Sequence, residues 1–199
     1  SYSSTNAQFG SAGAFDGSRY ISVPDSSDIA SNGGSLTVSV WCQVGTWDRS
    51  WQALLSKGEG SNYRLARQSN DGNAISYAGG SADIGGGAIN DGDWHHIMAV
   101  SEAGEGTYLY VDGQEVATGV APSLTDQGLS LLIGENPGAT GRQWNGGIDD
   151  VAIFDAPLSA SQAKAIHDLG MTYDYPMSDV IRILDVHDTR GTVSIGNET

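Results

Sequence analysis

The sequence predicts an all-β fold, an antiparallel sandwich of two sheets. The first observation is a succession of about ten short apolar runs with a period of two residues, which is the spacing of a strand that buries one face. The second is that 28 glycines interrupt these runs, as the turns between antiparallel strands require. The third is that 199 residues with 39% hydrophobic content suffice to enclose a core between two sheets.

The clearest strand runs from Ser35 to Val44. Its alternation places Leu36, Val38, Val40 and Cys42 on one face, whereas Trp41 falls among the polar residues of the other face, so the strand is expected to be covered on both sides. The other predicted strands cover residues 19–23, 52–57, 63–68, 74–77, 94–101, 106–111, 114–118, 130–134 and 147–154.

Two local signals mark a hairpin and a helix. Asp112-Gly113 separates two of the predicted strands, and this dipeptide readily adopts the positive φ angles of a type I′ turn. Ser159 followed by Gln162 is the pattern of a capping box. The sequence therefore predicts a tight hairpin at residue 112 and one short helix after Ser159, near the end of the domain.

The chain changes character after this helix. We assign residues 1–170 to one sandwich domain and residues 171–199 to a linker and a tail with two further strands, at 179–186 and 191–195. The tail is either the start of a following module or a segment that packs back onto the sandwich.

Composition restricts the classes of partner. The formal net charge of −15 opposes binding to nucleic acid and to anionic membrane surfaces, and no apolar run approaches the ~20 residues of a membrane span. Cys42 is the single cysteine, which excludes a disulfide framework and is compatible with an exported bacterial protein. Residues 1–10 lack the features of a signal peptide, so one was removed or none existed.

Two adjacent carboxylates, Asp149 and Asp150, stand at the start of a predicted strand. Because neighbouring residues of a strand point to opposite faces, one of them is expected to face the core, where a cation would compensate its charge. Asp16 offers a third carboxylate far upstream. Hard oxygen ligands favour calcium over zinc. In the alternative, Asp16 sits in an Asp-Gly turn and one of the later pair accepts backbone N–H groups.

The order of several short motifs resembles the laminin G-like, concanavalin A-like jelly-roll family over residues 8–170. The motifs are Phe15-Asp16-Gly17, Tyr20 to Pro24, Leu36 to Trp41, Asp93 to Ile97, Leu109 to Gly113, Ile133 to Glu135, Gly147 to Phe154 and Pro157 to Ser159. The resemblance implies a two-sheet antiparallel jelly roll that is exported, forms one module of a larger extracellular protein, and often binds carbohydrate. It also implies a structural calcium ion held by Asp16 and Asp149, with Asp150 as a further ligand.

Catalysis is not the expected function. Hydrolases of this architecture typically carry a Glu-x-Asp pattern on one strand, because an acid and a nucleophile must flank one glycosidic bond, and none of the glutamates here has an aspartate two residues later. In Tyr63-Arg64-Leu65-Ala66-Arg67 the arginines are interpreted as surface residues. The neighbours His95 and His96 diverge on a strand, so they are given structural roles.

The segment Gly45 to Trp51 carries the expected ligand site. We expect Trp47 to be exposed and to stack on a sugar ring, and Asp48 and Arg49 to bind its hydroxyl groups. Trp51 is expected to point into the core at the start of the next strand.

The sequence therefore predicts a non-catalytic carbohydrate-binding, lectin-like or adhesion module of a larger exported or cell-surface protein, with a structural calcium ion. Its partner would be a polysaccharide or glycoconjugate, or another protein. The alternative is a structural spacer or protein-interaction module that binds no glycan, and a polysaccharide lyase or glycoside hydrolase ranks third.

Overall fold

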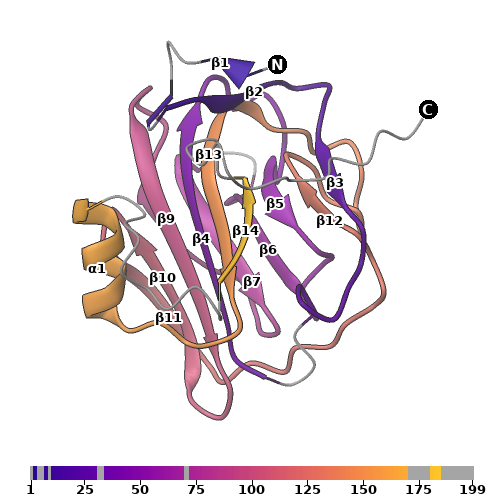
Figure 1. Cartoon of the computed structure of the whole chain (residues 1–199), viewed down its shortest axis with the longest axis vertical. Coiled ribbons are helices and arrows are strands. Elements are labelled where there is room, and N and C mark those ends of the chain that lie inside the picture. The colour runs from indigo at the N-terminus through magenta and orange to yellow at the C-terminus, as the bar shows by residue number, and fades with distance from the viewer. Residues whose placement is uncertain are drawn as a thin grey trace.

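The computed structural model describes residues 2–3, 7–8, 10–30, 34–69, 72–169 and 180–184. Two antiparallel sheets face each other, and one helix lies against the outside of the larger sheet (Figure 1). The predicted all-β, two-sheet antiparallel sandwich of jelly-roll type with one short helix is confirmed. Among the helices of this described part, none is long and apolar enough to cross a membrane.

The larger sheet has eight strands in the order β1-β2-β13-β4-β9-β10-β11, with β14 pairing with β13 off this path. β13 is its longest strand and pairs with β4 and, through its first residues, with β2. The bounds are β1 Tyr2–Ser3, β2 Ala12–Asp16, β4 Leu36–Val44, β9 Trp94–Glu102, β10 Gly106–Val111, β11 Gln114–Gly119, β13 Asn145–Phe154 and β14 Val180–Leu184.

The smaller sheet has six strands in the order β3-β12-β5-β6-β7-β8. Its central strands β5 and β6 are buried along most of their length, which follows from cover on both faces. The bounds are β3 Ile21–Val23, β5 Ala53–Ser56, β6 Tyr63–Arg67, β7 Ala74–Gly79, β8 Ile84–Ala88 and β12 Leu131–Ile133.

The core lies between the sheets and is built from alternate residues of their strands. Val38, Val40 and Cys42 of β4 belong to it, as the alternation predicts. Trp41 is buried on the opposite face of β4, where its ring stacks on His167 of the helix at 5.6 Å between centroids. β4 is therefore covered on both sides, by the second sheet and by the helix.

Both local signals are confirmed. Asp112 and Gly113 have φ angles of 51° and 71° and join β10 to β11. Helix α1, Ala160–Leu169, begins after Ser159, whose N–H donates to Gln162 Oε1 at 2.7 Å and whose Oγ accepts the Gln162 N–H at 3.4 Å. These reciprocal bonds satisfy two N–H groups at the helix start.

Three strands of the sandwich, β1, β2 and β8, are absent from the sequence-based assignment. β8 reads Ile-Gly-Gly-Gly-Ala, and glycines give no apolar alternation by which a strand can be recognised. Their small size has a packing reason, because a Cβ at Gly86 would lie 2.9 Å from the carbonyl oxygen of Val116, on the opposing sheet.

Part of the predicted tail lies in the described region. β14 pairs antiparallel with β13, with Val151 opposite Leu184 and Phe154 opposite Val180, so this segment packs back onto the larger sheet. The second predicted tail strand, at 191–195, lies outside the described residues. The boundary at residue 170 stays a prediction.

Candidate functional site

The two adjacent carboxylates lie in a β-bulge of β13. Asp149 is opposite Trp41 and Ala152 is opposite Ser39, so three steps along β13 match two along β4 and one residue is extra. Asp149 shares the outer face with Trp41, and Asp150 adopts a φ of 44°. Strict alternation does not hold across this bulge, but both carboxylates are buried, at 1% and 6% exposed, and the sequence predicts this burial for one of them.

Asp16 is far from this bulge. It lies opposite Asn145, four residues before Asp149, which is about 13 Å along a strand. Its exposed carboxylate accepts the N–H and the hydroxyl of Ser18 at 3.1 and 2.6 Å, and these bonds lower its pKa. Asp149 Oδ1 accepts the Asp150 N–H at 3.0 Å. These hydrogen bonds agree with the alternative in which Asp16 lies in a turn and one of the later carboxylates accepts a backbone N–H group, without a metal ion.

The described residues do not form the predicted calcium clip. The register separates Asp16 from Asp149 and Asp150, and no group of three or more His, Cys, Asp or Glu in this part of the chain could hold a metal ion. The predicted ligand set does not fit this geometry. Calcium binding itself stays a sequence-based prediction, which calorimetric titration of the chelated protein would test.

A buried lysine forms ion pairs with two loops at another place in the sandwich. The fully buried Nζ of Lys57, just after β5, lies 2.6 Å from Asp25 Oδ1 and 2.5 Å from Asp126 Oδ1. The hydrogen bond from Lys57 lowers the pKa of Asp126. Asp25 follows β3 and Asp126 precedes β12, so one ammonium group joins the two connections at this end of the sandwich.

Trp47 is not the exposed platform that the sequence suggests. Its half-buried ring packs against the core and meets Trp144 edge-to-face at 5.9 Å between centroids. The guanidinium of Arg67 lies 5.1 Å from the Trp47 ring centroid, and Arg67 also donates to the carbonyl oxygen of Arg49 at 3.0 Å. Trp47 therefore closes one end of the core.

Asp48 and Arg49 lie at the surface beside Trp47. Arg49 Nε is 3.7 Å from Asp48 Oδ1, and Arg49 Nη1 donates to Gln143 Oε1. The guanidinium thus ties the β4–β5 loop to the β12–β13 loop. With Trp47 packed inward, these two side chains are not grouped around an exposed aromatic ring.

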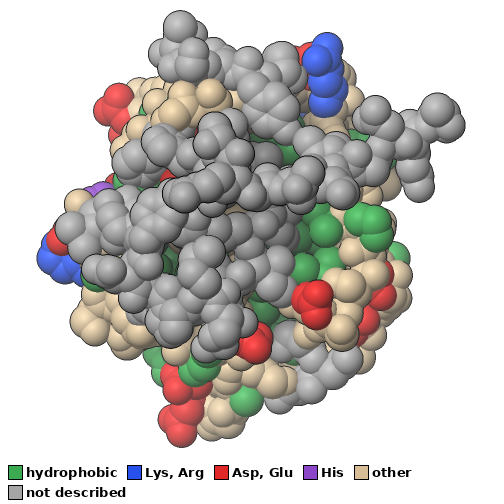
Figure 2. Space-filling model, viewed as in Figure 1, with side chains coloured by type: hydrophobic (Ala, Val, Ile, Leu, Met, Phe, Trp, Pro, Cys, Tyr) green, Lys and Arg blue, Asp and Glu red, His purple; other side chains and the backbone are tan. Residues whose placement is uncertain are grey.

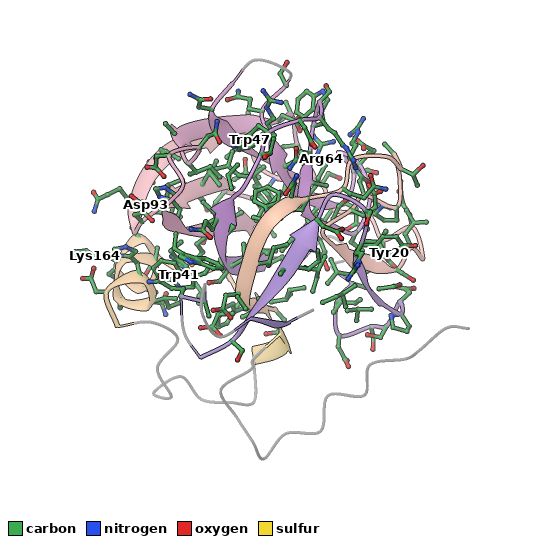
Figure 3. The ribbon with its side chains drawn as sticks, turned by 90° about the horizontal axis from the view of Figure 1, so that it is seen from above. Tyr20, Trp41, Trp47, Arg64, Asp93 and Lys164 are labelled. Carbon is green, nitrogen blue, oxygen red and sulfur yellow. The ribbon has the colours of Figure 1, made fainter. Side chains whose placement is uncertain are left out.

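Trp51 is half-buried like Trp47, but its ring lies outside the core, so the inward orientation predicted for it is wrong. It precedes β5 with a φ of 55°, and its N–H donates to the Ser69 carbonyl at 3.4 Å. Its ring lies over Arg64, 5.0 Å from guanidinium carbon to ring centroid. Figure 3 shows Trp47 and Arg64 lying away from the helix side, where Trp41 and Lys164 lie.

The position of Arg64 shows which side of the sandwich the Trp51 ring covers. Tyr63 and Leu65 of β6 belong to the core, so Arg64 lies on the outer face of the six-stranded sheet. Its side chain is 4% exposed and is covered by the Trp51 ring. The cation–π contact holds one face of the half-buried Trp51 ring against this side of the sheet.

Three charged side chains from three different loops form a network with Arg64, which lies against this ring. Glu59, between β5 and β6, accepts bonds from Arg64 Nη1 and from Arg142 Nη1, the latter at 3.0 Å. Asp83, between β7 and β8, lies 2.8 Å from Arg64 Nη2. Arg142 comes from the loop between β12 and β13. We call Trp51, Glu59, Arg64, Asp83 and Arg142 the Trp51 site.

The loop that carries Arg142 is held by a buried glutamate. Glu135 is 2% exposed and accepts the N–H groups of Asn136, Gly141 and Arg142 at 2.8, 3.1 and 2.9 Å. The carbonyl oxygen of Arg142 accepts the Ala53 N–H at 2.7 Å. Three bonds to one carboxylate fix the backbone, so the Arg142 side chain starts from a rigid loop.

The histidines on β9 have structural partners, as expected. His95 lies between Asp112 and Asp91, at 2.8 and 3.0 Å, and these carboxylates raise the pKa of His95 to about 9, Asp112 contributing most. Burial lowers the pKa of His96 to about 3, and its Nε2 lies 2.8 Å from Ser39 Oγ. The carboxylates favour the protonated form of His95, whereas burial next to His167 of α1 favours the neutral form of His96.

A separate hollow of about 290 Å³ lies along β2, β4 and β13. It offers little hydrogen-bonding chemistry, because Gln43 is its single polar side chain and already donates to the Gly92 carbonyl at 2.7 Å. For this reason we place the candidate site at Trp51. The hollow is lined by Ala12, Gly13, Ala14, Phe15, Gln43, Gly146 and Gly147.

Solved structures share this fold at low sequence identity. Domain 4 of AbnA, an extracellular GH43 arabinanase from Geobacillus stearothermophilus, in complex with arabinotriose, aligns with a TM-score of 0.65 and 21% identity over 84% of this chain and 80% of that one. The CBM40 of an IT-sialidase from Ruminococcus gnavus, bound to α2,3-sialyllactose, aligns with a TM-score of 0.53 and 14% identity over 67% and 82%.

Sequence comparison assigns the family. The mouse basement membrane-specific heparan sulfate proteoglycan core protein is 34% identical over 76 residues, which are 36% of this chain and 2% of that protein. The family model Laminin_G_3, described as the concanavalin A-like lectin/glucanases superfamily, matches residues 15–164. The expected family is thereby confirmed: the chain belongs to the Laminin_G_3 family of the concanavalin A-like lectin/glucanases superfamily.

Proposed function

We propose that this chain is a non-catalytic carbohydrate-binding module in which a sugar ring stacks on the outward face of Trp51. The observation that carries the proposal is the contact between Trp51 and Arg64, because it holds one face of a half-buried indole ring on the outside of the sheet, and we assign the opposite face to the sugar. The C–H groups of a sugar pack well against such an aromatic face.

The side chains around Trp51 supply the polar half of sugar recognition. Glu59 and Asp83 have side chains that are 42% and 33% exposed, so their oxygens can accept hydrogen bonds from sugar hydroxyl groups. Arg142, whose side chain is 25% exposed, can donate. An aromatic platform with a few fixed polar groups at its edge is the usual composition of a small-ligand site.

The solved relatives support the same class of ligand. The arabinanase domain is described in complex with arabinotriose and the sialidase module with sialyllactose, and both share this sandwich. By analogy with these two structures, we propose that this chain also binds carbohydrate. We also propose that it is exported and acts as one module of a larger extracellular protein, in line with the matrix proteoglycan relative and the negative net charge.

A glycan microarray with two matched variants tests the proposal. Trp51→Ala removes the platform, whereas Tyr20→Ala removes a side chain that is 51% exposed beside β3, three strands away from β6 in the sheet order. We expect the wild-type chain and Tyr20→Ala to bind the same glycans and Trp51→Ala to lose them. Retained binding by Trp51→Ala would refute the site, and a silent array would favour the spacer or protein-interaction alternative.

A further inference from the structure

The charged groups of the Trp51 site differ in how much of each a ligand can reach. The side chains of Glu59 and Asp83 are 42% and 33% exposed, whereas that of Arg64 is 4% exposed. A ligand approaching Trp51 therefore meets carboxylate oxygens before it meets the Arg64 guanidinium. We propose that this site, taken as the sugar site proposed above, selects neutral saccharides and rejects those that carry carboxylate, sulfate or phosphate groups.

The Arg64 donors that an anionic sugar would need are already engaged. Arg64 Nη1 and Nη2 donate to Glu59 and to Asp83, respectively. Arg142 shares only its Nη1 with Glu59, at 3.0 Å, and Glu59 lies beside it. An incoming carboxylate could reach the Arg64 guanidinium only by displacing Glu59 or Asp83. The displaced carboxylate would then lie beside the ligand anion, and such a juxtaposition of like charges is costly.

A neutral sugar meets no such conflict. Its hydroxyl groups can donate to the acceptor positions that remain, because each carboxylate can accept about four hydrogen bonds. Glu59 already accepts three, from Arg64, Arg142 and Asn136, whereas Asp83 accepts one from Arg64. The ion pairs then hold the acceptors in place. Adjacent hydroxyl groups of one ring can bridge the two oxygens of Asp83, so a sugar with a free vicinal diol is the best fit.

The charge of the whole chain acts in the same direction. The formal net charge is −15, so an anionic polysaccharide would be repelled before contact at low ionic strength. On the face drawn in Figure 2, Asp and Glu side chains are spread more widely than Lys and Arg. The two solved relatives were described with arabinotriose and with sialyllactose, one neutral and one acidic, so the shared fold does not decide between the classes.

Titration calorimetry with matched sugar pairs tests this selectivity. One pair is α-1,4-galactotriose and α-1,4-trigalacturonate, and a second is lactose and 3′-sialyllactose. Each neutral oligosaccharide that binds on the array is also paired with the corresponding uronic acid form. We expect the neutral member to bind at least about tenfold more tightly, with little dependence on salt. Preferred binding of the acidic member would overturn this inference and leave the proposed function standing. Binding of neither member of any pair would overturn the proposed function and this inference with it.

Two variants identify the groups responsible. Asp83→Asn and Glu59→Gln each remove one carboxylate charge and release one guanidinium contact, so both should narrow the preference for the neutral sugar while the Tyr20→Ala control keeps it. Circular dichroism and the melting temperature show that each variant is folded, and Asp83→Asn, which keeps the bonds between Glu59 and Arg142, is the milder change. An unchanged selectivity in both folded variants would contradict the role given to these carboxylates.

Discussion

Replacing Lys57 with methionine tests whether a buried ammonium group holds one end of the sandwich together. The side chain is 0% exposed, and its Nζ lies within 2.6 Å of Asp25 and 2.5 Å of Asp126. Methionine keeps the length and the apolar part of the side chain but removes the charge. Asp25 and Asp126 would then face an apolar group and repel each other.

The size of the effect follows from burial. Removing one partner of a buried ion pair costs about 3–5 kcal/mol, and the lower end applies because the Asp25 side chain is 35% exposed. We therefore expect Lys57→Met to lower the free energy of unfolding by about 3 kcal/mol, which is about 6–12 °C in melting temperature for a domain of this size. Urea unfolding and calorimetry measure both quantities.

Lys164→Met is the matched control. Lys164 Nζ also lies 2.6 Å from an aspartate, Asp168, but its side chain is 57% exposed. Exposed ion pairs contribute little to stability, so this variant should melt with the wild type. The reasoning would be refuted if the two variants lost the same small amount of stability, because burial would then not be the reason for the importance of Lys57.

Three further predictions concern the histidines and the glycines. His95 has a folded-state pKa raised to about 9, so the stability that its protonated ring contributes is complete below pH 6.5 and is lost as the pH rises through 9. After allowance for solvent screening, we expect the free energy of unfolding to fall by about 1 kcal/mol over this range. The His95→Gln variant should not show this fall. The ring of His96 should titrate near pH 3 in NMR spectra, and a midpoint near 6.5 would mean that the ring is not buried. Gly146→Ala should lower the free energy of unfolding by about 3 kcal/mol or more, because its Cβ would lie 2.0 Å from the Gln43 carbonyl oxygen. Gly141→Ala, also at positive φ but with no atom within 4 Å, should lower it by about 1 kcal/mol. Equal losses of stability in the two variants would contradict the close packing at Gly146.

The parts of the fold with strictly local causes could be predicted from the sequence. The Asp112-Gly113 turn depends on two residues that tolerate positive φ, and the start of α1 depends on bonds between Ser159 and Gln162. Both contacts span three residues or fewer. The buried face of β4 was likewise predictable, because alternation along one strand needs no knowledge of its neighbours.

The parts with non-local causes could not. The bulge that carries Asp149 and Asp150 is a mismatch between β13 and β4, and no residue in either segment marks it. The packing of Trp51 outside the core depends on the path of the loop, which turns at the positive φ of Trp51. The alternation of residues 63–67 sets Arg64 on the face opposite Tyr63 and Leu65, but its burial, at 4% exposed, contradicts the surface position interpreted from the sequence.

The most direct test of the proposed Trp51 site is to observe by NMR which tryptophan contacts the ligand. The chain has five tryptophans, so its NMR spectrum contains five indole N–H signals, and Trp51→Phe assigns the one from Trp51. On titration with a neutral oligosaccharide found on the array, we expect the Trp51 signal to shift with saturation while those of Trp41 and Trp47 stay in place. A shift of the Trp47 signal with Trp51 unchanged would contradict the proposed site.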